Sequence, residues 1–202
     1  MEVLTVLAVM TIMTAIGAGM LKPRTGNPAD AAQLVAAACN AAQADAIATG
    51  APARVILCID PTAGNHYLRY VGILEQDSSL TTSTTTYWRF SAKGNTLPDG
   101  TLFVASTSYS NSTDTMLYDL NNIGTSQTGA TGSTCTYIEF DPTGQVANGS
   151  NSIQWVFEHG MVSAANASLV AENKKDLDGF IVRRLGKFVY FASPDQITAP
   201  TL

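Results

Sequence analysis

The sequence predicts an α+β fold, in which a protruding N-terminal hydrophobic helix is followed by a helix packed on an antiparallel β-sheet. Three observations support this prediction. Residues 1–21 carry a single charge, Glu2. Residues 28–49 are rich in alanine and follow a helix-start signal. From residue 53 onward, short β-branched or alternating runs are separated by turn residues. We therefore divide the chain into a hydrophobic assembly or transmembrane helix, residues 1–25, and a globular domain, residues 26–202.

The hydrophobic segment, residues 1–21, has three interpretations. As a helix it would span roughly 31 Å, the thickness of a hydrocarbon core. A secretory signal peptide is disfavoured because Glu2 stands where basic residues are expected. A single-span membrane anchor leaves Glu2 without a partner and places Lys22 and Arg24 against the positive-inside bias if the N-terminus is cytoplasmic. The third interpretation is a helix that leaves the membrane and packs against copies of itself.

The start of the chain carries a family resemblance. Glu2 is followed by V-L-T-V-L-A-V-M-T-I-M-T-A-I-G, and this run resembles the start of type IV pilins and type II secretion pseudopilins. In that family a prepilin peptidase cuts before a short hydrophobic lead-in to a characteristic glutamate. That glutamate is normally the fifth mature residue, whereas here it is residue 2, so we expect the numbered chain to lack the leader and the first few mature residues.

The resemblance implies a structural subunit, not an enzyme, that polymerises through its N-terminal helix into a type IV pilus or a pseudopilus-like filament. It implies residence in the inner membrane before assembly and in an extracellular or periplasmic filament afterwards. The partners would be copies of the chain or other pilins, and we expect no cofactor, metal or nucleic acid. The expected assembly residues are the glutamate with apolar and small residues of the same segment: Glu2, Leu4, Leu7, Met10, Ala15, Gly17, Ala18 and Gly19.

A second helix is predicted directly after a break at residues 22–28, where two prolines and a glycine interrupt the chain. Asn27 is a suitable N-cap, Pro28 fits the first turn, and Gly50 ends the helix. This alanine-rich helix, with the small-residue turn that follows it, resembles the H-type minor pseudopilins. The apolar residues at helical spacing, which we expect to face the sheet, are Leu34, Ala37, Ala41, Ala44 and Ala48, with Ile47 beside them.

The rest of the chain reads as strands and turns. The predicted strands span residues 54–60, 66–75, 87–90, 101–105, 116–118, 134–141, 153–157, 180–184 and 187–191. We expect hairpins over 54–75 and 180–191, and a long polar surface excursion over 106–133, in which 116–118 forms an edge strand. The pattern at 160–173 fits a helix and a strand equally well.

Composition and motifs argue against several functions. The net charge is −5 and no basic stripe is present, which disfavours nucleic-acid binding. His66 and His159 are the only histidines, and each is interpreted as a surface or core residue. Asp176 and Asp178 lie in a D-x-D-G motif, but adjacent lysines oppose a cation, so we expect a solvated turn there. The N-x-S/T sequons at Asn111, Asn148 and Asn166 are interpreted as chance matches.

The three cysteines, Cys39, Cys58 and Cys135, show no zinc-ligand spacing with one another or with the histidines. The low charge and the many Ser and Thr residues are typical of exported proteins, in which one disulfide would form. The sequence leaves all three pairings open, and Cys39 equally suits a buried position in an alanine-rich helix. The alternative function is a membrane-anchored surface or periplasmic binding domain, and an enzyme ranks third.

Overall fold

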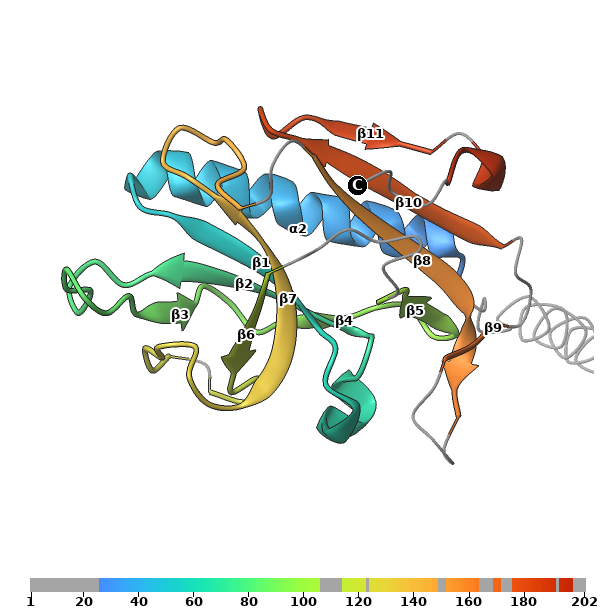
Figure 1. The fold of residues 1–202 in the computed structure, drawn as a ribbon, viewed down its shortest axis with the longest axis horizontal. Helices are drawn as coiled ribbons and strands as arrows, with labels where there is room; N and C mark the ends of the chain where they lie inside the picture. Colours follow the sequence, from blue (N-terminus) through green and yellow to red (C-terminus); the bar gives the residue numbers. More distant parts are fainter. Residues whose placement is uncertain are drawn as a thin grey trace, which may run out of the picture.

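The computed structural model describes residues 26–105, 114–122, 124–148, 152–163, 169–171, 176–191 and 193–197 (Figure 1). The hydrophobic segment and most of the predicted break at residues 22–28 lie outside these ranges. Gly26 and Asn27, the described part of the break that precedes the helix, are non-helical. In the described part of the chain, no helix is both long and apolar enough to cross a membrane.

Helix α2, Pro28–Thr49, begins and ends where the sequence predicts. The Asn27 side chain accepts a hydrogen bond from the Ala29 N–H at 3.0 Å, which satisfies one of the free donors of the first turn. Gly50 adopts the left-handed conformation with φ 65°, and its N–H donates to the Ala46 carbonyl at 3.0 Å. Both ends are therefore capped by local interactions.

The buried face of α2 differs from the predicted one. Ala37, Ala41, Ala44 and Ala48 are exposed, and Ile47 is 56% exposed. The residues that are buried instead are Pro28, Ala31, Ala32, Val35, Ala36, Cys39, Ala42 and Ala46. The prediction failed because alanine occurs on every side of this helix, so the apolar pattern distinguishes one face from another only weakly.

The first sheet has the strand order β3-β2-β1-β7-β6, and β4 pairs with β2. Every pairing in it is antiparallel. Its strands are β1 (Ala53–Cys58), β2 (Tyr70–Gln76), β3 (Trp88–Phe90), β4 (Asn95–Thr96), β6 (Thr115–Tyr118) and β7 (Ser133–Phe140). The 3₁₀ helix η1 (Pro61–His66) joins β1 to β2. The hairpin predicted over 54–75 is confirmed, with a later start of its second strand, and β6 forms the predicted edge strand.

The second sheet has the order β11-β10-β8-β5, and β9 pairs with β8. Its pairings are also antiparallel. Its strands are β5 (Thr101–Phe103), β8 (Ser152–Val162), β9 (Leu169–Ala171), β10 (Leu177–Arg183) and β11 (Phe188–Tyr190). A 3₁₀ turn, η2 (Pro194–Gln196), follows β11. Pairing of Phe180 with Tyr190 confirms the predicted closing hairpin.

The predicted fold class was wrong. The described residues are mostly β, with 39% strand and 21% helix, and they combine one long helix with two curled antiparallel sheets. A protruding N-terminal helix is not part of the described structure. The error arises in segments where the sequence signal was short or ambiguous. Strand β8 continues past Phe157 to Val162, and β10 includes Asp178 and Gly179, which were predicted in a solvated turn.

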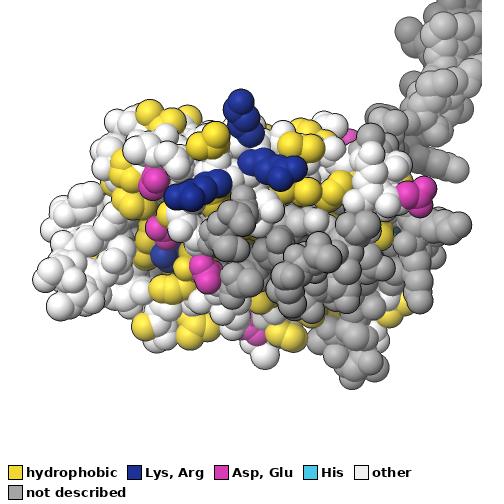
Figure 2. Space-filling view, turned by 45° about the horizontal axis from the view of Figure 1, so that its top comes forward, with side chains coloured by type: hydrophobic (Ala, Val, Ile, Leu, Met, Phe, Trp, Pro, Cys, Tyr) yellow, Lys and Arg dark blue, Asp and Glu magenta, His cyan; other side chains and the backbone are white. Residues whose placement is uncertain are grey.

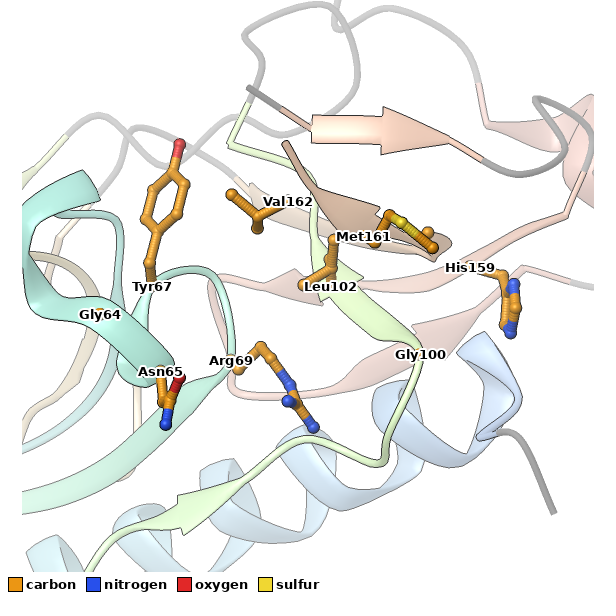
Figure 3. Close-up of a pocket in the computed structure, with 10 residues that line it drawn as sticks. Gly64, Asn65, Tyr67, Arg69, Gly100, Leu102, His159, Met161 and Val162 are labelled. Carbon is orange, nitrogen blue, oxygen red and sulfur yellow. The ribbon is translucent and has the colours of Figure 1, made fainter. Parts of the chain in front are cut away.

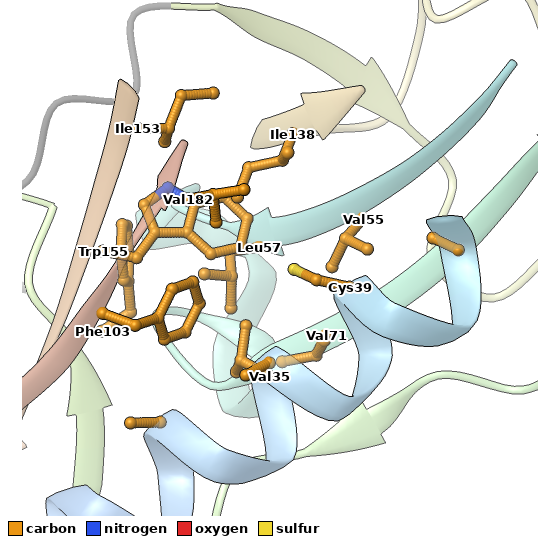
Figure 4. Close-up of a cluster of buried hydrophobic side chains, with 14 of the residues drawn as sticks. Val35, Cys39, Val55, Leu57, Val71, Phe103, Ile138, Ile153, Trp155 and Val182 are labelled. Atoms are coloured by element: carbon orange, nitrogen blue, oxygen red, sulfur yellow. The ribbon is translucent and has the colours of Figure 1, made fainter. Parts of the chain in front are cut away.

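Helix α2 lies between the two sheets, in contact with β1 and β2 on one side and with β8 and β10 on the other. Alternate residues of β1 face opposite ways, as the strand period requires, so Val55 and Leu57 pack against the helix. Figure 4 shows Val35 and Cys39 of α2 beside these two residues, and Trp155 from the second sheet in the same cluster. One hydrophobic core therefore joins the helix to both sheets.

A second cluster covers the other face of the first sheet, around the buried Arg54. The Arg54 Nε donates to Glu139 at 2.6 Å, and its Nη1 donates to the Tyr118 hydroxyl at 2.7 Å. Its guanidinium carbon lies 3.8 Å from the ring centre of Trp88 and 4.1 Å from that of Tyr137. Burial raises the pKa of Tyr118 to about 12, so this hydroxyl stays neutral. The buried charge is therefore partnered on several sides.

Candidate functional site: the junction before helix α2 and its pocket

All the predicted assembly residues, from Glu2 to Gly19, lie outside the described residues, so their arrangement stays a prediction. The described structure does show where the chain enters the domain from that segment. We call the contact between Gly26 and the turn at residues 98–100 the junction. It lies directly before the N-cap of α2, at the end of the predicted break.

Gly26 is pressed against the 98–100 turn. Its N–H donates a hydrogen bond to the Asp99 carbonyl at 2.7 Å. A Cβ atom added to Gly26 would lie 2.3 Å from the Pro98 Cβ and 3.0 Å from the Asp99 carbonyl oxygen, closer than side chains normally approach. Glycine is therefore required for this close approach of two backbone segments.

Arg69 also binds this turn. Its Nη2 donates to the Asp99 carboxylate at 2.6 Å and to the Leu97 carbonyl at 3.0 Å. The Asp99 side chain is 93% exposed, so this ion pair contributes little stability by itself. The ion pair instead helps to position the turn. Asp99 accepts a hydrogen bond from Gly26 at its carbonyl and one from Arg69 at its carboxylate.

The Arg69 pocket, of about 390 Å³, opens beside the junction (Figure 3). It lies between η1 with the turn that leads into β2, strand β5 with the residue before it, and the end of β8. Figure 3 shows Leu102, Met161 and Val162 close together, with Arg69 and His159 nearer to the helix. The lining residues are Gly64, Asn65, Tyr67, Arg69, Gly100, Leu102, His159, Gly160, Met161 and Val162.

Gly100 packs closely against His159 in the wall of the Arg69 pocket. Gly100 has φ 79°, and a Cβ atom added to it would lie 3.0 Å from Nε2 of His159. Its carbonyl accepts a hydrogen bond from the Gly160 N–H at 3.0 Å, which ties the 98–100 turn to β8. The turn that contacts Gly26 is therefore also anchored to the second sheet.

The chemistry of the Arg69 pocket suits binding of a partly apolar group. Leu102 and Val162 supply apolar surface, and Met161 is 69% exposed. Burial raises the pKa of Tyr67, so its hydroxyl stays neutral and offers a hydrogen bond. The Arg69 Nε is buried and has no acceptor among the described residues. Within the same described set, no group of three or more His, Cys, Asp and Glu side chains converges.

A second, more polar pocket of about 420 Å³ also borders η1 and includes Asp60, His66 and Asp119. The Asp60 carboxylate accepts hydrogen bonds from the Thr62 N–H at 2.8 Å and the Thr62 hydroxyl at 2.7 Å. It also accepts from the Thr134 N–H at 3.2 Å. These bonds, chiefly those from Thr62, hold the pKa of Asp60 below its usual range. This carboxylate is therefore used to hold the turn after β1.

The structure places the two histidines apart. His66 ends η1, and its ring packs edge-on against Tyr70 with 5.0 Å between ring centres. His159 lies in β8 and lines the Arg69 pocket. The half-buried Asp178 of the D-x-D-G motif lies in β10, where its carboxylate accepts a hydrogen bond from the Gly179 N–H.

The Asn148 sequon has a structural use in the described chain. The Asn148 side-chain oxygen accepts a hydrogen bond from the Glu139 N–H at 2.6 Å, and its amide nitrogen donates to the Tyr137 carbonyl at 2.8 Å. Both polar atoms of the amide thus bind β7. The other two sequon asparagines, Asn111 and Asn166, lie outside the described residues.

Exposed hydrophobic side chains occur on several elements. On the face shown in Figure 2, they are interspersed with polar and charged side chains. Met161 and Val170 are paired in the β8–β9 ladder, and single exposed hydrophobic side chains elsewhere are usual for a protein surface. The large ones are Ile47, Leu80, Met161, Val170, Leu185, Val189 and Tyr190.

The junction residues were not singled out from the sequence as functional. The break at 22–28 was predicted from its prolines and glycine, and residues 97–100 lie between the predicted strands 87–90 and 101–105. The contact between them joins residues that are far apart in the chain, and no local pattern indicates it.

Comparison of the chain with protein-family models gives no match, and comparison with curated proteins and with solved structures gives none either.

Proposed function

We propose that the chain is a structural, pilin-like subunit that polymerises through residues 1–21. The observation that carries this proposal is the sequence of that segment, in which Glu2 is the single charge among 21 residues. Such a segment is unstable in water, because burying apolar surface contributes roughly 25 cal/mol per Å². Packing against copies of itself buries that surface and allows Glu2 to meet a positive group on a neighbour.

Two further features support this function. Ala15, Gly17, Ala18 and Gly19 are small residues, which let neighbouring helices approach closely. The junction holds the chain against the domain at Gly26, so the polymerising segment would leave the domain from a defined point. The subunit would reside in the inner membrane before assembly and in an extracellular or periplasmic filament afterwards. Its partners would be copies of itself or other pilins.

A membrane-anchored binding domain is the second candidate. The Arg69 pocket favours it, because this pocket offers apolar surface and a guanidinium beside the point where the anchor would join. The two candidates differ in one measurable property. A filament subunit self-associates through residues 1–21, whereas an anchored binding domain stays monomeric once it is extracted from the membrane.

Removal of residues 1–24 tests the proposal. We expect the shortened chain to be a soluble, folded monomer that no longer polymerises, as measured by sedimentation and electron microscopy. Replacement of Glu2 with Ala should reduce assembly, because the segment loses its one charged contact. Polymerisation of the shortened chain would place the contacts in residues 25–202 and refute the proposal.

A matched pair of substitutions tests the packing of the segment. Gly17→Leu should disrupt assembly by keeping neighbouring helices apart, whereas Ser78→Leu should not, because Ser78 is exposed in the loop after β2. Equal filament yields from the two variants would contradict close packing at Gly17.

A further inference from the structure

The antiparallel register of β1 and β7 places Cys58 directly opposite Cys135. In the adjacent pair, the Ile59 N–H donates to the Thr134 carbonyl at 2.9 Å. Hydrogen-bonded and non-hydrogen-bonded pairs alternate along an antiparallel ladder, so Cys58 and Cys135 form a non-hydrogen-bonded pair. In such pairs the Cα atoms are about 4.5 Å apart and the side chains are closest.

Cys58 and Cys135 lie on the same face of the first sheet, and Cys39 lies on the other. Cys58 and Cys135 are both fully buried in the cluster on the face of the sheet that points away from α2. Cys39 is fully buried on the opposite side, where α2 packs against Val55 and Leu57. The sheet therefore separates Cys39 from the other two cysteines.

We propose that Cys58 and Cys135 form a disulfide that ties β1 to β7, and that Cys39 remains a free, buried thiol. Disulfides join Cα atoms that are roughly 4.4–6.8 Å apart, a range that includes a non-hydrogen-bonded pair. The bond closes a long loop that contains η1 and strands β2 to β6. This cross-link is independent of polymerisation and belongs to the domain itself.

The bond forms by thiol–disulfide exchange as the domain folds, because both thiols are fully buried once folding is complete. The co-reactant is a low-molecular-weight disulfide such as oxidised glutathione.

The exchange proceeds in two balanced steps. The thiolate of one of the two cysteines attacks one sulfur of the external disulfide, forms a mixed disulfide and releases the first external thiol. The other cysteine then loses its proton and attacks the cysteine sulfur of that mixed disulfide, which releases the second external thiol. The two cysteines lose two electrons and two protons, and one external disulfide is reduced to two thiols.

Trypsin separates the three cysteines, so peptide mapping of the full chain reads the pairing directly. Cleavage after Arg24, Arg54, Arg69, Lys93 and Lys174 places Cys39 in peptide 25–54, Cys58 in peptide 55–69 and Cys135 in peptide 94–174.

The reduced full chain is unfolded in urea, refolded with reduced and oxidised glutathione, alkylated in urea and digested without reductant. Peptides 55–69 and 94–174 should then appear as one species, about 2 Da lighter than their sum. Peptide 25–54 should be alkylated.

Variants separate this pairing from a non-specific oxidation. Cys39→Ser should keep the link, and Cys58→Ser and Cys135→Ser should each lose it. Reduction should lower the Tm by roughly 10 °C in the oxidised wild type and in Cys39→Ser, because the loop constraint on the unfolded chain is lost. Alkylation of all three cysteines after refolding, or a link that involves Cys39, would overturn the proposal. The tryptic peptide map of the wild-type chain tests the pairing even if a serine variant fails to fold.

Discussion

Burial of the charged Arg54 side chain depends on several neighbouring side chains. A guanidinium taken out of water is costly unless other groups replace its hydration. Here Glu139 and Tyr118 supply hydrogen bonds, and Trp88 and Tyr137 supply aromatic faces. These partners come from β3, β6 and β7, so the charge links several strands of the first sheet.

We expect Glu139→Gln to destabilise the domain by about 2–3 kcal/mol, because the buried Arg54 charge would lose its counter-charge. Tyr118→Phe should cost about 1 kcal/mol, the effect of one lost hydrogen bond. Urea denaturation measures both values. The control is Glu75→Gln, which breaks a more exposed pair with Arg89 at 3.9 Å and should change stability by less than about 0.5 kcal/mol. Equal effects at Glu139 and Glu75 would contradict a structural role for the buried pair.

Glu158 is a second buried ionisable residue, and its environment differs from that of Arg54. Its side chain in β8 is buried, and its Oε1 has no hydrogen-bond partner among the described residues. Burial raises the pKa of Glu158 above its usual range. A carboxyl group with a raised pKa favours folding while it is protonated, and this contribution is lost as pH rises through the folded-state pKa.

We therefore expect Glu158→Gln to be more stable than the wild type at pH 7, because ionisation of this carboxyl group in the unfolded chain favours unfolding of the wild type. Below about pH 4 the wild-type carboxyl group is neutral in the folded and unfolded states, and the difference should disappear. Urea midpoints of both proteins between pH 4 and 8 measure this. A difference that does not change with pH would show that charge burial is not the cause.

At the scale of the element, α2 shows that the limits of a helix and its orientation have different origins. Asn27 and Gly50 cap it through bonds within a few residues. Its orientation depends on contacts with both sheets, which select the side that carries Val35, Cys39 and Ala42. Small residues on that side let α2 lie close to the strands on both sides of it.

Adjacent alanines test this orientation. Ala42→Leu should destabilise the domain by about 1–3 kcal/mol, because extra methylene groups would enter a packed core. Ala41→Leu should change stability by less than about 0.5 kcal/mol, because Ala41 is exposed. Chemical denaturation measures both, and the same pair distinguishes the observed face from the predicted one. A larger loss at Ala41 would mean that the helix is rotated.

At the scale of the whole molecule, α2 makes the two sheets parts of one core. Val55 from the first sheet and Trp155 and Phe180 from the second belong to the same hydrophobic cluster as the helix. Neither sheet can separate from α2 without exposing that cluster to water, which is unfavourable in proportion to the apolar area. The described chain should therefore unfold as one unit.

The two tryptophans report on the two sheets separately. Trp88 lies in β3 of the first sheet, and Trp155 lies in β8 of the second. In Trp155→Phe the fluorescence follows the first sheet, and in Trp88→Phe it follows the second. In each variant we expect the fluorescence and far-UV circular dichroism transitions to coincide. Transitions at separate urea concentrations would show that the sheets unfold independently.

The sequence by itself determined the features that depend on near neighbours. The ends of α2 followed from Asn27, Pro28 and Gly50, because capping bonds join residues within one turn. The positions of most strands followed from alternation and from the turn residues between them. The Glu2 segment and the function inferred from it also come from the sequence alone, since residues 1–25 lie outside the described structure.

Only the tertiary structure decided the features that join distant segments. It selected the buried side of α2, placed Cys58 opposite Cys135, and brought Gly26 to Asp99. It also made a second sheet from segments whose sequence signal was short or ambiguous. Strand register and packing at close range choose among partners far apart in the chain, and local propensity does not encode that choice.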